Sequence, residues 1–144
     1  MDIKENALNI TEKYRTTDPF EIAKQKNITV LYADLGNTLV FYNTYKRFKF
    51  IHINNQIDEI TQRFVCAHEL GHAVLHPQAN TPFLRNQTFF SVDRLEIEAN
   101  TFAVELLLTD EMVSAYEDTR LSIQEVAEIY GIPSGFARLK TYIC

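Results

Sequence analysis

The sequence predicts an α+β fold in which a small antiparallel three-stranded sheet packs against a central helix and further helices. Three runs rich in β-branched and aromatic residues lie close together, at 28–32, 38–45 and 48–53. Strands joined by such short connections usually pair as an antiparallel meander. From about residue 58 the apolar period becomes helical. The second half of the chain is therefore expected to supply helices that cover the sheet.

Two helices are expected before the first strand. Residues 3–15 carry apolar side chains at helical spacing. Asp18, Pro19 and Glu21 then form a helix start, because Asp can cap the first turn, Pro suits the first helical position and Glu follows three residues after the cap. This second helix is predicted to end near Asn27.

The helices of the second half are marked by their capping residues. The central helix is predicted over 58–76, because Pro77 cannot continue it. The later elements are a loop over 77–91, a helix over 92–108, a shorter helix capped by Thr109, a helix opened by the capping box Ser122–Glu125, and a helical turn over 134–142. Without a visible repeat or linker, residues 1–144 are expected to form a single domain that includes a helix-turn-helix-like segment at 120–144.

Composition excludes some classes of function. The net charge of −5 over 144 residues argues against direct nucleic-acid binding, which needs clustered Lys and Arg. No apolar run approaches the roughly 20 residues that span a bilayer, and the polar stretch at 1–6 does not resemble a secretory signal. A cytoplasmic location is therefore expected. Cys66 and Cys144 make no disulfide framework, and Cys66 is expected to be a buried, inert thiol.

Residues 68–72 read His-Glu-Leu-Gly-His and suggest a metal site on the central helix. On a helix, side chains four residues apart share one face, roughly 6 Å apart at Cβ. His68 and His72 can therefore both reach one zinc ion at about 2.0–2.1 Å. Glu69 lies about 100° around the helix, beside the metal position, where it can act as the general base of metal-assisted hydrolysis.

Gly71 supports this interpretation. A glycine inside a helix costs about 1 kcal/mol relative to alanine. Its position between the two histidines predicts the close approach of another backbone at the metal-facing side of the helix.

The helix over 92–108 offers Glu96 or Glu98 as the third ligand. Small and apolar residues share the face of Glu96, namely Ala99, Asn100, Ala103 and Leu107. The opposite face, expected to meet solvent, carries Arg94, Glu98, Thr101 and Glu105. Glu96 is therefore the expected ligand, because a buried carboxylate without a partner is costly. Glu98 is interpreted as a solvated helix charge, and Asn100 is expected to bond a ligand histidine and fix its tautomer.

Two further histidines are kept out of the predicted site. His76 lies eight residues after His68, roughly 12 Å along the axis, so these two cannot share a metal. It is interpreted as a histidine favoured by the helix C-terminus, or as a contact to a ligand or substrate. His52 is interpreted as a hydrogen-bonded histidine of the sheet.

These motifs resemble the ImmA/IrrE family of metallo-endopeptidases, within the zincin group. The resemblance rests on Ala67–His72 with Leu75-His76, and on the pattern from Glu96 to Leu107. Looser likeness extends over most of the chain. One departure is Leu108-Thr109, where the family usually has Met-Pro.

The resemblance implies a zincin-like fold and the cleavage of a helix-turn-helix repressor of a phage or mobile element by a cytoplasmic enzyme. The protein partner would be a cognate transcriptional repressor. Two alternatives stay open: a non-catalytic zinc-binding transcriptional regulator or interaction module, and a metal-dependent hydrolase of another substrate. The presence of Glu69 favours catalysis, because a structural zinc needs no base.

Overall fold

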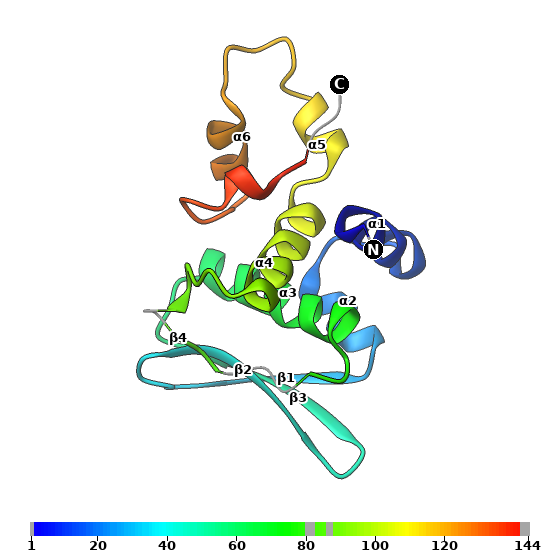
Figure 1. Cartoon of the computed structure of the whole chain (residues 1–144), viewed down its shortest axis with the longest axis vertical. Helices are drawn as coiled ribbons and strands as arrows, with labels where there is room; N and C mark the ends of the chain where they lie inside the picture. The colour runs from blue at the N-terminus through cyan, green and yellow to red at the C-terminus, as the bar shows by residue number, and fades with distance from the viewer. Residues whose placement is uncertain (1, 80–82, 86–87, 142–144) are drawn as a thin grey trace.

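The computed structural model describes residues 2–79, 83–85 and 88–141. In chain order the elements are α1 (Ile3–Tyr14), α2 (Pro19–Gln25), β1 (Ile28–Ala33), β2 (Thr38–Tyr45), β3 (Phe48–Asn54), α3 (Glu59–Leu75), β4 (Leu84–Arg85), α4 (Arg94–Leu107), α5 (Asp110–Ser114), α6 (Ile123–Ile129) and a 3-10 turn, η2 (Ala137–Leu139). The sheet forms one layer, α3 and α4 lie over it, and α5 and α6 lie at the end farthest from the sheet (Figure 1). None of the described helices is long and apolar enough to cross a membrane.

The α+β class is confirmed, but the sheet differs from the predicted meander. The strand order is β1-β3-β2-β4, and β1 pairs in parallel with β3, whereas β2 is antiparallel to both β3 and β4. The tight turn at Lys46, which has a φ of 58°, folds β3 back along β2, and β3 then lies between β1 and β2. Strand β4 is only two residues long and falls in the predicted loop, where no period-two pattern could mark it.

One face of the sheet packs against α3. Ile51 and Ile53 of β3 are fully buried on this face, whereas Phe50 and His52 point to the other, as the strand period predicts. Helix α3 contacts β2 and β3 on this face. Helix α3, which carries His68 and His72, therefore packs on an apolar surface of the sheet.

Helix α3 begins as predicted and touches α4 very closely. The Asp58 carboxylate accepts a hydrogen bond from the Thr61 backbone N–H at 2.7 Å and so caps the helix. A Cβ atom added to Gly71 would lie 3.1 Å from the Ala99 carbonyl oxygen and 3.1 Å from the Phe102 Cβ. The predicted close approach of another backbone is confirmed.

The C-terminal segment covers part of α4. The capping box at Ser122 is present, but the predicted turn over 134–142 is shorter, at Ala137–Leu139, and residue 142 lies outside the described residues. Glu105 was expected in solvent, and this prediction is wrong. Its carboxylate is buried and lies 2.7 Å from the Lys140 ammonium, because the segment around Lys140 packs over this side of the helix.

Candidate metal centre

Helix α3 brings two imidazoles together at its buried face. His68 and His72 lie one turn apart, and their side chains are 0% and 6% exposed. Their Nε2 atoms lie 3.1 Å from each other. Both rings therefore present the same nitrogen to one point between them.

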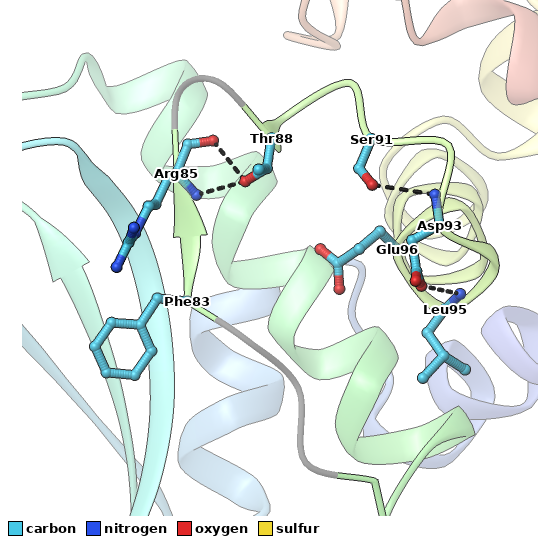
Figure 2. A pocket seen from close by; sticks show the side chains of 7 residues that line it. All are labelled: Phe83, Arg85, Thr88, Ser91, Asp93, Leu95 and Glu96. Atoms are coloured by element: carbon cyan, nitrogen blue, oxygen red, sulfur yellow. Dashed lines mark hydrogen bonds between the residues drawn. The ribbon is translucent and has the colours of Figure 1, made fainter.

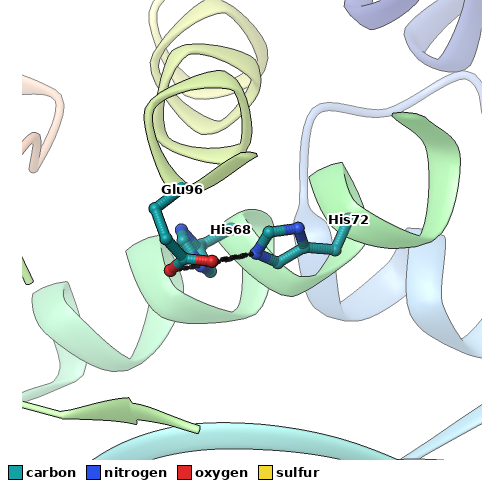
Figure 3. A group of neighbouring side chains, drawn as sticks. All are labelled: His68, His72 and Glu96. Carbon is teal, nitrogen blue, oxygen red and sulfur yellow. Dashed lines mark hydrogen bonds and ion pairs between the residues drawn. The ribbon is translucent and has the colours of Figure 1, made fainter. Parts of the chain in front are cut away.

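Helix α4 brings the Glu96 carboxylate to that point (Figure 3). Its Oε1 lies 2.9 Å from the His72 Nε2, and its Oε2 lies 3.2 Å from the His68 Nε2. Burial alone would raise the pKa of Glu96, but the hydrogen bonds and charges of the two histidines outweigh it and lower the pKa to about 2. The carboxylate is therefore ionised at neutral pH.

Asn100 fixes the orientation of the first histidine, as its spacing predicted. The His68 Nδ1 lies 2.7 Å from the Asn100 Oδ1. Because the amide oxygen only accepts, the Nδ1 of His68 donates to it, which leaves Nε2 as the ring nitrogen available to a metal ion.

The arrangement of donors fits a divalent cation. One ligand atom from each of His68, His72 and Glu96 lies within 4.8 Å of the others. The Nε2 atoms of His68 and His72 and the carboxylate oxygens of Glu96 lie so close together that a positive charge is needed between them, which a proton or a metal ion can supply. Two imidazoles and one carboxylate are a ligand set typical of catalytic zinc, which keeps a fourth position for substrate or water.

Glu69 lies in the same buried region, and one of its oxygens has no partner among the residues that the structure describes. Its Oε2 is buried and has no hydrogen-bond partner among the described residues. Burial raises the pKa of Glu69 to about 7, Glu96 adds to the rise, and His72 opposes it. A carboxyl group with a pKa near neutrality can both take and release a proton.

His76 and Glu98 contact the centre from the side; such a contact was one of the alternatives predicted for His76, whereas sequence reasoning missed the part of Glu98. The His76 Nδ1 lies 3.0 Å from the His72 Nδ1, and the His76 Nε2 lies 2.8 Å from the Glu98 Oε1. The prediction that Glu98 is a solvated helix charge holds in part: its side chain is 28% exposed, and its carboxylate is paired with His76 and Arg94. The spacing of four residues from His72 to His76 was the available signal, but the partner on α4 depends on how the two helices cross.

A cavity of about 730 Å³ opens beside the centre (Figure 2). The Glu96 carboxylate points into this space from α4. The remaining lining residues come from the first turn of α4, from the segment before it, and from β4 and the residue that precedes β4: Phe83, Arg85, Thr88, Ser91, Asp93 and Leu95. The cavity gives a ligand access to the candidate centre.

Cys66 and His52 take no part in the centre, as expected. The Cys66 thiol is free and buried, and burial raises its pKa far above the usual range. The His52 ring stacks on Phe41, and its Nε2 lies 2.8 Å from the Asn43 Oδ1.

Comparison with known proteins shows a matching family and two named relatives. The pattern of the IrrE N-terminal-like domain, a peptidase family, matches residues 23–142. A Bacillus phage phi105 protein, "Uncharacterized immunity region protein 2", is 47% identical over 139 residues, which are 96% of this chain and 88% of the relative. "Metallopeptidase ImmA" of Bacillus subtilis (strain 168) is 34% identical over 136 residues, which are 92% of this chain and 79% of the relative.

Proposed function

The chain belongs to the peptidase family of IrrE N-terminal-like domains, and on that premise we propose that it is a zinc-dependent endopeptidase that cleaves a helix-turn-helix repressor. The observation that carries the proposal is the convergence of His68, His72 and Glu96 on one point, with the unpartnered oxygen of Glu69 buried beside it. A single-domain chain acting in the cytoplasm is part of the same proposal.

The side chains take distinct roles in this reaction. His68 and His72 would hold the zinc ion through Nε2, and Glu96 through its carboxylate. A bound zinc ion would polarise the scissile carbonyl and make the attacking water more acidic. Glu69 takes a proton from the attacking water at its Oε2 and then delivers it to the leaving amine, while the water oxygen joins the carbonyl carbon. Burial of Glu69 keeps bulk solvent from competing for this proton.

The named relatives support a regulatory protein as the substrate. One relative carries the name of a metallopeptidase and another that of a phage immunity region protein. A peptidase of an immunity region is suited to remove a repressor, because cleavage of a repressor switches genes irreversibly. The cavity beside Glu96 would receive an extended segment of such a protein.

A DNA-binding role has less support from the segment after α5. This segment resembles part of a helix-turn-helix and carries Arg138 and Lys140 near its end. Lys140 is buried against Glu105, so it does not face a phosphate backbone.

The test is incubation of the purified protein with helix-turn-helix repressors encoded beside its gene, with and without a chelator, followed by intact-mass analysis. Cleavage at one bond that stops with the chelator and returns with zinc is expected. The Glu69→Gln variant should still fold and bind zinc, but its cleavage rate should fall by about 10²–10⁴-fold or more. Glu59→Gln makes the same change at an exposed position of the same helix and should cleave normally. Undiminished cleavage by Glu69→Gln would overturn the mechanism.

A further inference from the structure

A chain of hydrogen bonds connects the second histidine of the centre to α4. The His72 ring contacts His76 through two Nδ1 atoms 3.0 Å apart, and His76 reaches the Glu98 Oε1 through its Nε2 at 2.8 Å. Both contacts lie on the side of His72 away from Glu96, which faces its Nε2. These hydrogen bonds therefore act on the Nδ1 side of the His72 ring, opposite the proposed metal position.

The chemistry of the last group sets the direction of every hydrogen bond. An ionised carboxylate only accepts, so the Nε2 of His76 donates to Glu98. In a neutral His76 ring the Nδ1 then carries a lone pair and accepts from His72. The Nδ1 of His72 is thus the donor, which leaves its Nε2, on the side of Glu96 and His68, as the atom available to a metal ion.

We propose that His76 and Glu98 are positioning residues that fix the tautomer and the ring orientation of His72 for metal binding. This inference rests on the proposed zinc site. Asn100 does the same for His68 through one amide oxygen. The two ligand histidines are therefore oriented by different partners. His68 is oriented by one amide of α4, whereas His72 is oriented by His76 at the end of α3 together with Glu98 of α4. Partners of this kind commonly change metal affinity by about 10–100-fold when they are removed.

The local structure places His76 for this task. His76 is the C-cap residue of α3, and its backbone N–H donates to the His72 carbonyl at 2.8 Å. The His76 side chain is only 8% exposed, so solvent does not replace its partners. Glu98 has a second neighbour, Arg94, whose Nε lies 3.6 Å from the other carboxylate oxygen and whose side chain is 86% exposed.

Two isosteric variants separate the two ends of the His76 ring. Asn places its terminal amide where the imidazole has Nδ1, and Gln places it where the imidazole has Nε2. His76→Asn can therefore keep the acceptor at His72, while His76→Gln keeps only the contact to Glu98. We expect zinc affinity, measured by competition with a fluorescent chelator, to stay near wild type in His76→Asn and to fall about 10–100-fold in His76→Gln.

Glu98→Ala tests the last group in the series of hydrogen bonds that begins at His72, and Arg94→Ala is its matched control. Glu98→Ala should weaken zinc binding about tenfold, because His76 loses the acceptor that fixes its tautomer. Arg94→Ala should leave zinc affinity unchanged. Thermal melts of the zinc-free variants show whether each one folds.

A tautomer measurement on the wild-type protein does not depend on any variant folding. Nitrogen-15 NMR of the zinc-free protein should show the His72 ring protonated at Nδ1. An Nδ1 without a proton, or equal zinc affinity in both His76 variants and wild type, overturns the proposal. If the wild-type protein takes up no zinc, the proposed function fails and this inference fails with it. If the wild-type protein binds zinc and the variants bind it equally well, only the positioning role is rejected.

Discussion

Replacing Gly71 by alanine tests the contact that holds the two metal-binding helices together. An added Cβ would lie 3.1 Å from the Ala99 carbonyl oxygen, 3.2 Å from the Ala99 Cα and 3.1 Å from the Phe102 Cβ. Ordinary contacts between such atoms begin near 3.5 Å. The nearest neighbours are two backbone atoms of Ala99 and the Cβ of Phe102, whose positions the α4 backbone fixes, so α4 must shift by a few tenths of an ångström.

Two opposing terms set the size of the effect. Alanine favours the helix by about 1 kcal/mol over glycine, whereas forcing extra volume into a packed core costs about 1–3 kcal/mol. We expect a net loss of up to about 2 kcal/mol in the free energy of unfolding of the zinc-free protein. Because Glu96 lies one turn before Ala99 on α4, the shift should also move its carboxylate and weaken zinc binding.

Urea unfolding of the zinc-free protein and chelator competition for zinc measure the two effects. Ala73→Gly, at a half-buried position of the same helix, gauges the cost of a helical glycine by the reverse change. A Gly71→Ala protein that is about 1 kcal/mol more stable than wild type, with unchanged zinc affinity, would refute the reasoning.

Three other experiments test the fold around the centre, two with substitutions and one by labelling. Asp58→Ala removes the cap of α3 and should lower the free energy of unfolding by about 1 kcal/mol. Hydrogen bonds from Thr61 lower the pKa of Asp58 in the folded state, so the difference in stability between the two proteins should be complete above the ordinary pKa of Asp and should disappear as the pH falls through the lowered pKa. Acid titrations of both proteins, followed by circular dichroism, measure this difference. Lys140→Met leaves the buried Glu105 carboxylate without its cation and should destabilise the protein by about 3–5 kcal/mol in chemical unfolding, and a double change that also replaces Glu105 by Leu should recover much of the loss. Cys66 should resist alkylation in the folded protein, because its thiol is buried and its pKa is raised; fast labelling mapped to Cys66 by mass spectrometry would contradict this.

Local signals were sufficient to predict the helices and most of the candidate centre. The caps at Asp58 and Ser122 act within a few residues, so their patterns predicted the helix starts that the structure shows. The spacing of His68 and His72 fixes their shared face within a single helix. Glu96 and Asn100 followed from the period of α4.

Features that depend on distant segments could not be read from local patterns. The parallel pairing of β1 with β3 depends on which strand enters the middle of the sheet, and strand spacing does not determine that. The period of α4 correctly placed Glu98 and Glu105 away from Glu96. It could not show that His76 and Lys140 come from elsewhere in the chain to pair with them.

A crystal structure of the zinc-loaded protein, with anomalous diffraction recorded on both sides of the zinc absorption edge, tests the central claim most directly. We predict one anomalous peak about 2.0–2.2 Å from the Nε2 atoms of His68 and His72 and from a carboxylate oxygen of Glu96. The Glu69 carboxylate should lie beside the ion without binding it. A peak coordinated by other residues, or no peak in protein saturated with zinc, would contradict the account.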